Sequence, residues 1–340
     1  MRCAKLISVK RLFKEFLPVL VLILFCFLYY QYTPKSAHLL HEKINNSNPT
    51  VLNEQRMNLS QELHEYLASG LPKNPGKTPT ILNLFLGNQR KLLDLRFKQA
   101  INEIKTSKIG PGEFRIWSLM NMGVVIKTKN KIIAIDTADM SLSGVQKELI
   151  DTVDLFLVTH GDADHYDQAL LKKALQNQKL VVLPQNLGFL FQKENYPKLY
   201  QPKYSEPITI DGVKITAFQT DHRGDGNFME ASAWYLVEIN GIKILHTGDG
   251  RDFKNKFEKD NLAKANINIF LCNAKATHPL NIRDLKPDVV VPLHLYKFMH
   301  SREELEQSTF GHVTNLYTQY KNKLKRIDVK LLFPGESFVF

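Results

Sequence analysis

The sequence predicts an α/β fold, in which two β-sheets are covered by helices and preceded by one N-terminal transmembrane helix. Short β-rich runs alternate with helical patterns along residues 109–340, which indicates sheets with helices on their faces. The pairs Asp211-Gly212 and Asn240-Gly241 each stand between apolar runs and predict tight hairpins. The apolar run over residues 16–32 reaches the lower limit of about 17 residues that a bilayer requires.

The N-terminal segment has the features of an uncleaved signal anchor. Basic residues precede the apolar run, among them Lys5, Lys10, Arg11 and Lys14, and this positive flank is expected to stay in the cytoplasm. The run ends in bulky Tyr29-Tyr30-Gln31-Tyr32, whereas a cleaved signal peptide ends in small residues. We therefore predict a basic cytoplasmic tail at residues 1–15 and a membrane anchor at 16–32. The remainder is expected on the exported, periplasmic or extracellular, side; a cleaved signal and a buried core helix are the alternatives.

Residues 33–108 are predicted to form a tether with juxtamembrane helices. Asparagines and a proline mark a loop at residues 45–49, and glycines and prolines mark a second break at 70–79. Leu59 to Leu67 predict a short helix between them. From Lys91 to Lys105, apolar residues recur at helical spacing beside basic ones. This pattern favours a helix that covers the flank of the following domain, with a helix on the membrane surface as the alternative.

Composition narrows the classes of partner. The 340 residues are 44% hydrophobic, which is enough for a large core. The formal net charge of +11 indicates a mild preference for anionic neighbours such as lipid head groups. No stripe of Lys and Arg is interleaved with aromatic residues, so nucleic-acid binding is not indicated. Of the three cysteines, only Cys272 lies in the predicted exported part, so no disulfide is expected there; we predict a buried strand cysteine.

The elements of residues 109–340, the predicted catalytic domain, follow from their local patterns. Helices are expected at about 143–150 and at 168–176. Strands are expected at 114–119, 124–128, 132–136, 155–158, 180–183, 208–210, 213–218, 233–239, 242–245, 267–272 and 289–291.

A dense group of metal-binding residue types follows one of these strands. The segment Thr159-His160-Gly161-Asp162-Ala163-Asp164-His165 comes directly after the apolar run 155–158. These side chains would repel one another or remain unpaired if they packed together, unless a cation is present. We interpret the segment as a site for a pair of divalent metals; a solvated acidic turn is the alternative.

Further ligand types stand at the ends of later strands. His222, Asp249 and His294 each follow an apolar run, and Asp136 ends an earlier one. A single strand-end histidine is usually a satisfied polar residue. Three such positions, in order after the ligand-rich loop, favour a metal centre held by loops on a rigid sheet.

These motifs resemble those of the metallo-β-lactamase-fold hydrolase superfamily, whose first loop reads His-x-His-x-Asp-His and is followed by a His, an Asp and a His on separate loops. The resemblance covers roughly residues 113–340 and implies an αββα sandwich. By position it implies a first metal on His160, Asp162 and His222, a second on Asp164, His165 and His294, and Asp249 bridging both. Asp136 would brace the motif loop from outside the ligand set.

One residue departs from the family pattern, because Asp162 stands where the second histidine is usual. A carboxylate is a harder ligand, so manganese and iron become alternatives to zinc, which remains the expected metal. The same substitution is familiar from competence-type DNA-uptake nucleases, whose loop continues with a glycine pair. Here Tyr166-Asp167 follows instead, which is similar to the branch of ascorbate-6-phosphate lactonase and N-acyl-phosphatidylethanolamine phospholipase D. Flavodiiron proteins use a glutamate at this position.

The predicted function is that of a membrane-anchored, metal-dependent hydrolase of a small molecule or lipid. Two metals that share a water would supply a hydroxide near neutral pH, with Asp164 taking the proton. His278 is the candidate acid for the leaving group, or else an exposed loop residue; Asn121 and Arg223 are candidate substrate contacts, and His246 is expected to pack. Phosphodiesters, including phospholipids, are favoured over lactones or other cyclic esters. A di-iron oxidoreductase, an exported nuclease and a non-catalytic metal-binding module are the alternatives.

Overall fold

The computed structural model describes residues 17, 36–49, 53–69, 87–138, 144–191, 195–222, 232–253, 256–274, 279–295, 315, 318 and 326–340. The predicted anchor, residues 16–32, lies outside this set except for Leu17. Within the described residues, no helix combines the length and the apolar character needed to cross a bilayer.

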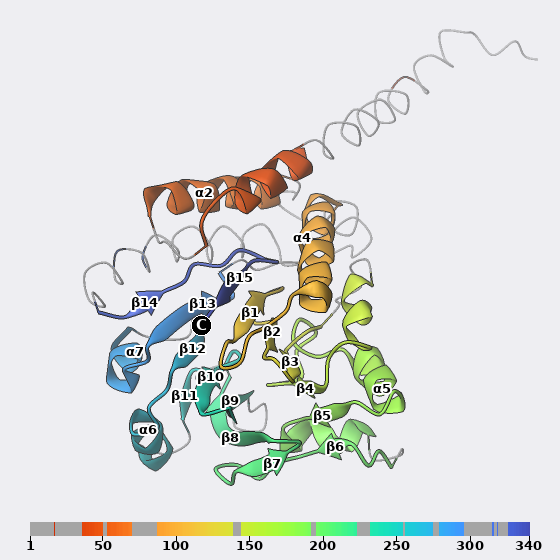
Figure 1. Cartoon of the computed structure of the whole chain (residues 1–340), viewed down its shortest axis with the longest axis vertical. Coiled ribbons are helices and arrows are strands. Elements are labelled where there is room, and N and C mark those ends of the chain that lie inside the picture. The colour runs from red at the N-terminus through yellow and green to blue at the C-terminus, as the bar shows by residue number, and fades with distance from the viewer. Residues whose placement is uncertain are drawn as a thin grey trace, which may run out of the picture.

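Two β-sheets form the centre of the described structure (Figure 1). The first has, in spatial order, β15 (Ser337–Val339), β1 (Arg115–Ser118), β2 (Val124–Lys127), β3 (Ile132–Ile135), β4 (Leu155–Leu157), β5 (Leu180–Val182) and β6 (Leu199–Tyr200). The second has β11 (Asp252–Phe253), β8 (Val213–Asp221), β9 (Ser232–Ile239), β10 (Ile242–His246), β12 (Ile269–Asn273), β13 (Val289–Leu293) and β14 (Asp328–Val329), with β7 (Ile208–Ile210) paired to β8.

Both sheets follow the same plan. Antiparallel pairs come first, β15-β1-β2-β3 in one sheet and β11-β8-β9-β10 in the other. Parallel pairs follow, β3-β4-β5-β6 and β10-β12-β13-β14. Parallel strands need a connection that crosses over the sheet, and these connections carry some of the helices that cover the outer faces.

Side chains alternate between the two faces of each strand, and this alternation assigns them to two separate buried clusters. In β2 and β3, Val124, Ile126, Ile133 and Ile135 belong to the cluster that lies between the sheets, whereas Val125 and Ala134 belong to the cluster beneath the helices. Because successive side chains of a strand point to opposite faces, runs that are apolar throughout can fill both layers. These short, continuously apolar strands are therefore buried on both sides.

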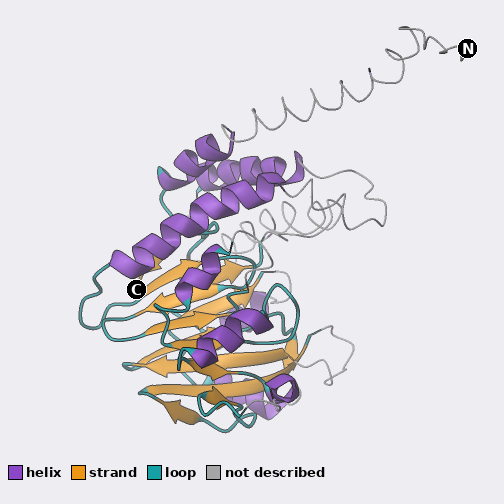
Figure 2. Cartoon of the chain, turned by 90° about the vertical axis from the view of Figure 1, so that its right-hand side faces the viewer, coloured by secondary structure: helices purple, strands orange, loops and turns teal. Residues whose placement is uncertain are grey.

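Helices cover both outer faces, as Figures 1 and 2 show. They are α2 (Glu54–Ser69), α4 (Gly87–Thr106), α5 (Gln168–Gln176), α6 (Lys256–Ala263) and α7 (Pro279–Leu285), with the 3-10 helices η1 (Val145–Leu149) and η2 (Gln185–Phe191). Helix α5 has the bounds that the sequence predicts. It begins at Gln168 because Asp167 caps it by accepting hydrogen bonds from the amides of Ala169 and Leu170.

The helices that precede residue 109 pack on the sandwich. Residues 36–45 are helical, and Leu40 and Ile44 join Leu63 of α2 and Phe97 of α4 in the same buried cluster as Trp117 of β1. The apolar face predicted for Lys91 to Lys105 is thus buried against the protein, as the favoured interpretation required. The division into tether and catalytic domain at residue 109 stays a prediction.

Two buried arginines hold this helical layer to the C-terminal turn at residues 333–336. Arg56 of α2 donates to both carboxylate oxygens of Glu336, at 2.9 and 2.5 Å, and its guanidinium lies 4.0 Å from the ring centre of Phe333. Arg96 of α4 donates from Nε to the carbonyl oxygen of Pro334 at 2.8 Å. Both arginines are 1% exposed, and burial lowers the pKa of Arg96 to about 10.

Some elements differ from the prediction at their ends. The segment predicted as a helix at 143–150 forms η1, which starts after Gly144 in a left-handed conformation. Strand β8 continues three residues beyond Phe218 because Gln219 and Thr220 pair with β9 and Asp221 pairs with β11. The two predicted hairpins are confirmed: Asp211-Gly212 and Asn240-Gly241 all have positive φ, as a two-residue type I′ turn requires.

Candidate metal centre

The seven residues predicted as metal ligands lie together where strands end at one edge of the sandwich. Strand β4 leads into residues 160–165, β8 into His222, β10 into Asp249 and β13 into His294. Strands β8 and β10 both run antiparallel to β9, and β13 is parallel to β12 and β10, so their carboxyl ends share an edge. The rigid sheets therefore fix the loops that carry the cluster.

Hydrogen bonds between the sheets close this edge. The amide of Ala233 in β9 donates to the carbonyl oxygen of Thr159 at 2.9 Å, and the buried Tyr235 hydroxyl donates to that of Val158 at 3.0 Å. The motif loop of the first sheet is thereby anchored to the second sheet, which carries His222, Asp249 and His294.

Three residues form one half of the cluster. Oδ2 of Asp162 lies 3.6 Å from Nε2 of His160 and 3.5 Å from Nε2 of His222. The Asp162 side chain is 58% exposed, while that of His160 is buried. This half therefore opens to solvent on the side of the carboxylate.

A similar trio forms the other half. Oδ2 of Asp164 lies 3.3 Å from Nε2 of His165 and 3.5 Å from Nε2 of His294. These side chains are 13% exposed or less, so this half is deeper in the protein.

Asp249 lies between the halves. Its Oδ2 is 3.6 Å from Nε2 of His165, 3.8 Å from that of His222 and 3.7 Å from that of His294. Its Oδ1 accepts a hydrogen bond of 2.7 Å from the amide nitrogen of Asn273, at the end of β12. Asn273 thus holds one oxygen while the other faces histidines of both halves.

The buried carboxylate of Asp136 fixes the two histidine rings of the motif loop. It accepts hydrogen bonds from Nδ1 of His165 at 2.9 Å and from the backbone amide and the hydroxyl of Thr159, both at 2.7 Å. With its proton directed to Asp136, the Thr159 hydroxyl accepts from Nδ1 of His160 at 3.0 Å. Both rings are thereby held at Nδ1 and turn Nε2 toward the carboxylates, where its lone pair could bind a metal ion. This matches the predicted bracing role of Asp136.

The geometry fits a pair of divalent ions. The separations between histidine nitrogens and carboxylate oxygens exceed the usual hydrogen-bond length of about 2.9 Å. Two ligand atoms that bind one tetrahedral zinc ion at about 2.0–2.2 Å are about 3.4 Å apart, which lies within the observed 3.3–3.8 Å. Among the described residues, Nε2 of His160 and of His165 has no hydrogen-bond partner although it is buried. A cation would satisfy both nitrogens.

The electrostatics of the cluster also favour a cation. Burial acts to raise the pKa of Asp249, but the imidazoles of His294 and His165 hold it well below its usual range. Burial acts to lower the pKa of His165, but the carboxylates of Asp249, Asp136 and Asp164 raise it well above its usual value. The acids are therefore ionised at neutral pH, and their negative charge requires compensation.

The other predicted residues have mixed outcomes. Asn121, a candidate substrate contact, donates from Nδ2 to Oδ2 of Asp164 at 2.8 Å, and its contact with substrate stays a prediction. His246 packs as expected: it is wholly buried, donates from Nε2 to the carbonyl oxygen of Met122 at 2.9 Å and accepts from the amide of Gly248. His278 and Arg223 lie outside the described residues. Cys272 is buried in β12, as predicted.

Sequence reasoning missed Asn273 and the role of Thr159. Asn273 ends the apolar run of β12, and a polar residue at the carboxyl end of a strand is the same signal that singles out Asp136 and His294. Thr159 stands directly before His160, yet its link to Asp136 joins residues 23 apart and has no local signature.

Comparison with known proteins gives a consistent picture. A family model described as a β-lactamase superfamily domain matches residues 116–294, more than half of the chain and all seven cluster residues. A UPF0173 metal-dependent hydrolase of Thermococcus onnurineus (strain NA1) is 29% identical over 150 residues, which cover 42% of this chain and 66% of the relative. One of Polynucleobacter asymbioticus is 26% identical over 178 residues, 43% of this chain and 59% of the relative. The matched part of the chain thus spans less than two thirds of the length of each of these relatives.

Solved structures resemble the fold. Igni18, a metallo hydrolase from Ignicoccus hospitalis, superposes with a TM-score of 0.52 at 18% identity, over 67% of this chain and 98% of that one. CmlA, a diiron β-hydroxylase from Streptomyces venezuelae, superposes with a TM-score of 0.51 at 11% identity, over 69% of this chain and 54% of that one. At such identities the likeness concerns the fold alone. With its two-sheet α/β architecture and its match to the family model, the chain belongs to the metallo-β-lactamase superfamily.

Proposed function

We propose that this protein is a metal-dependent hydrolase that holds two divalent ions. The observation that carries the proposal is the position of Asp249 Oδ2, 3.6–3.8 Å from the Nε2 atoms of His165, His222 and His294. One carboxylate oxygen directed at histidines of both halves suits a ligand shared by two ions. The relatives named metal-dependent hydrolases support the same class of activity.

In this proposal His160, Asp162 and His222 hold the first ion, Asp164, His165 and His294 the second, and Asp249 both. Bound ions would lower the pKa of a shared water toward neutrality and polarise the substrate's carbonyl or phosphoryl oxygen. Burial acts to raise the pKa of Asp164, but His165 and His294 hold it well below its usual range. Its carboxylate is therefore ionised and can orient the attacking water as a hydrogen-bond acceptor. We also assign to Asp164 the proton of that water. His278 remains our candidate for protonating the leaving group.

Phosphodiesters, including phospholipids, are the proposed substrates, with lactones and other cyclic esters second. The net charge of +11 and the predicted anchor at residues 16–32 favour anionic substrates at a membrane surface. The Tyr166-Asp167 continuation of the motif supports the lactonase and phospholipase D branch.

Anchoring and export are separate parts of the proposal, motivated by the basic flank before residue 16. A reporter fused after Phe340 should be active only in an exported compartment, and the full chain should stay in membranes after a carbonate wash. Release of a shortened soluble protein would exclude the anchor and favour a cleaved signal peptide.

A di-iron oxidoreductase is the second candidate, favoured by the donors around Asp162. Two histidines and one carboxylate within 3.5–3.6 Å form the set that non-haem iron oxygenases use. The choice between the candidates depends on the metal and on the reaction.

The deciding experiment loads the purified full-length chain separately with zinc, manganese and iron. Each form is assayed on a panel of phosphodiesters, phospholipids, single-stranded and duplex DNA, and lactones, with oxygen uptake measured in parallel. We expect ester hydrolysis that depends on added metal and is lost on chelation. Oxygen uptake by the iron form without hydrolysis by any form would favour the second candidate.

A further inference from the structure

We propose that Asn121 is a positioning residue for the second metal, the ion assigned above to Asp164, His165 and His294. This inference rests on the proposed dinuclear centre and names the residue that sets the geometry of its deeper half. Asn121 lies in the tight turn between β1 and β2 and is 3% exposed.

The backbone of this turn places Asn121 against His294. Asn121 adopts a left-handed conformation with φ 51°, which asparagine tolerates better than most residues. Two backbone hydrogen bonds close the turn. The amide of Gly123 donates to the carbonyl oxygen of Met120 at 2.6 Å, and the amide of Leu119 donates to that of Gly123 at 2.7 Å. The carbonyl oxygen of Asn121 then accepts a bond of 3.0 Å from the amide of His294. One residue of the first sheet thus fixes the backbone of a predicted ligand in the second.

The side chain of Asn121 fixes another predicted ligand. Its Nδ2 donates to Oδ2 of Asp164 at 2.8 Å. The same Oδ2 is the oxygen that faces His165 and His294, at 3.3 and 3.5 Å. The bond therefore restrains the metal-facing oxygen itself and favours the ionised form of the acid. Asn273, by contrast, holds the other oxygen of its carboxylate, Oδ1 of Asp249.

The orientation of the Asn121 side-chain amide costs free energy that its hydrogen bond to Asp164 can offset. Oδ1 of Asn121 is buried and has no hydrogen-bond partner among the described residues. Rotating the amide by half a turn would bring that oxygen against the carboxylate of Asp164, where two acceptors repel. Within the described part of the chain, a buried acceptor is thus left unpaired while the donor is directed at Asp164, which is unusual for a residue with only a packing role.

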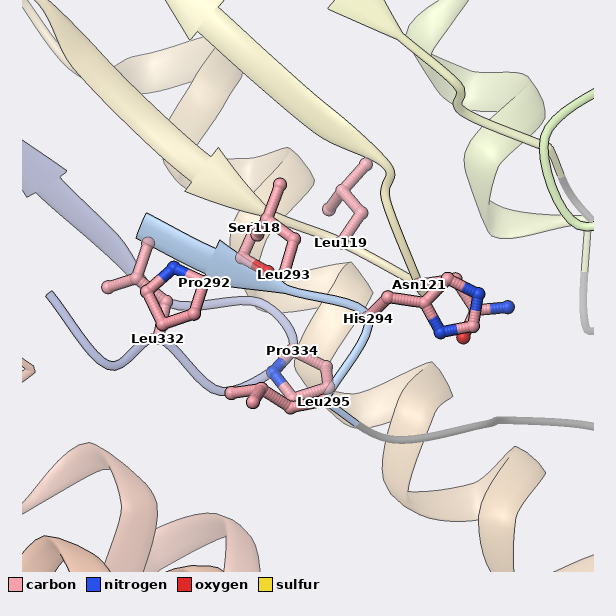
Figure 3. A pocket seen from close by; sticks show the side chains of 9 residues that line it. All are labelled: Ser118, Leu119, Asn121, Pro292, Leu293, His294, Leu295, Leu332 and Pro334. Atoms are coloured by element: carbon pink, nitrogen blue, oxygen red, sulfur yellow. The ribbon is translucent and has the colours of Figure 1, made fainter. Parts of the chain in front are cut away.

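Surrounding contacts make this corner rigid. Figure 3 shows the side chains of Asn121 and His294 together at one side of a pocket that Leu295 and Pro334 also line. The C-terminal turn pairs with the end of β1 through two backbone hydrogen bonds. The amide of Gly335 donates to the carbonyl oxygen of Ser118 at 2.7 Å, and the amide of Ser118 donates to the carbonyl oxygen of Glu336 at 2.9 Å. Asn121 is thus held three residues after a strand that is itself pinned, as a precise ligand support requires.

The test compares Asn121→Gly with the matched control Asn240→Gly. Glycine keeps the positive φ and removes only the side chain, and Asn240 has the same φ of 51° in the β9–β10 hairpin, outside the cluster. Full-length proteins are stripped of metal and titrated with zinc, recording the stoichiometry, the affinity of each ion and the melting temperature of the metal-free form. His294→Ala, which removes a ligand of the second site alone, identifies the affinity that belongs to that site.

We expect Asn121→Gly to weaken the ion that His294→Ala also weakens, by about 10- to 100-fold, as is typical for a residue that orients a ligand. The other ion should keep its affinity, and Asn240→Gly should bind both ions as the wild type does. Wild-type affinities in Asn121→Gly, equal weakening of both ions, or the same loss in Asn240→Gly would each overturn the proposal. A wild type that binds fewer than two ions would refute the dinuclear function first, and the inference with it.

A second variant keeps the test decisive if Asn121→Gly melts below the assay temperature. Asn121→Asp has nearly the same shape and also tolerates positive φ, but replaces the donated proton by a second acceptor beside Asp164. The same selective weakening of the second ion is expected. Unchanged binding of both ions would overturn the proposal.

Discussion

His165 donates a hydrogen bond of 2.9 Å from Nδ1 to Oδ2 of Asp136, and both side chains are fully buried. Asp136 directly follows β3 with a left-handed φ of 52°, which turns its carboxylate toward the loop after the neighbouring strand β4. Through Thr159 the same carboxylate also orients His160. One residue outside the cluster therefore sets the rings of two proposed ligands, one for each ion.

Replacing Asp136 by asparagine should weaken both ions, by about 10- to 100-fold each. The shape of the side chain is kept, but an amide accepts through one oxygen only and cannot satisfy the three donors that converge on the carboxylate. Zinc affinities from chelator competition check this. Asp154→Asn is the control, because Asp154 accepts the amide of Ile132 at the opposite end of β3. Unchanged affinities in Asp136→Asn would contradict the bracing role.

Asp164→Asn should leave the fold intact and reduce hydrolysis about 100-fold or more. The substitution removes a ligand charge and the proposed proton acceptor together. Turnover on the best substrate of the panel, with metal content measured on the same sample, gives the answer. Asp167→Asn is the matched control in the same loop, since asparagine also caps helices well and α5 should persist. Near wild-type turnover with both ions bound would show that the proton acceptor is misassigned.

The pair Arg56 and Glu336 should stabilise the protein by joining the helical layer to the C-terminal turn. Breaking a buried pair leaves an uncompensated charge, so Arg56→Met alone should cost about 3–5 kcal/mol of unfolding free energy. Denaturant unfolding measures the loss. The double variant Arg56→Met with Glu336→Leu should recover most of it, because apolar residues of similar volume remove both charges at once. A double variant as unstable as the single one would show that the pair has a role beyond charge compensation.

Local patterns predicted much of the sandwich. Continuous apolar runs gave the buried strands, the Asx-Gly pairs gave two hairpins, and Gln168–Gln176 was predicted with its observed bounds. The ends of strands also located the cluster, because a polar residue that directly follows a buried run has to lie at the sheet's edge. Asp136 and His294 follow this rule, whereas Asp249 comes three residues after the end of β10.

Contacts between distant residues could not be predicted in the same way. Arg96 is on the helix predicted from residue spacing, but its guanidinium is buried against Pro334, 238 residues away. Arg56 and Glu336 are 280 residues apart, and neither segment alone marks the pair. Asn121 was singled out by its position, but its partner Asp164 depends on how the two sheets meet. Periodicity reports which face is buried, whereas such pairs depend on the packing of whole layers.

Asp162 should set the metal preference of the first site. Its carboxylate faces Nε2 of His160 and of His222 at 3.6 and 3.5 Å, the place at which the resemblance expects a histidine. Aspartate is shorter than histidine and carries a full charge, so the site should favour harder ions. Asp162→His should therefore raise the occupancy of zinc relative to manganese and iron while the protein stays a folded hydrolase. Competition loading with equal concentrations of the three metals, followed by elemental analysis, measures the preference.

Asp162→Ala should instead deplete the first ion, because His160, His222 and the shared Asp249 would be the only ligands left there. The side chain is 58% exposed, so the metal-free variant should melt within a few degrees of the wild type. Asp151→Ala, which removes an exposed carboxylate from the turn after η1, controls for the loss of one negative charge. Since Asp162 serves one ion only, the expected content is close to one ion per chain, compared with two in the wild type and in Asp151→Ala. Equal occupancy in all three proteins would show that Asp162 is not a ligand, and the preference for hard ions would then need another source.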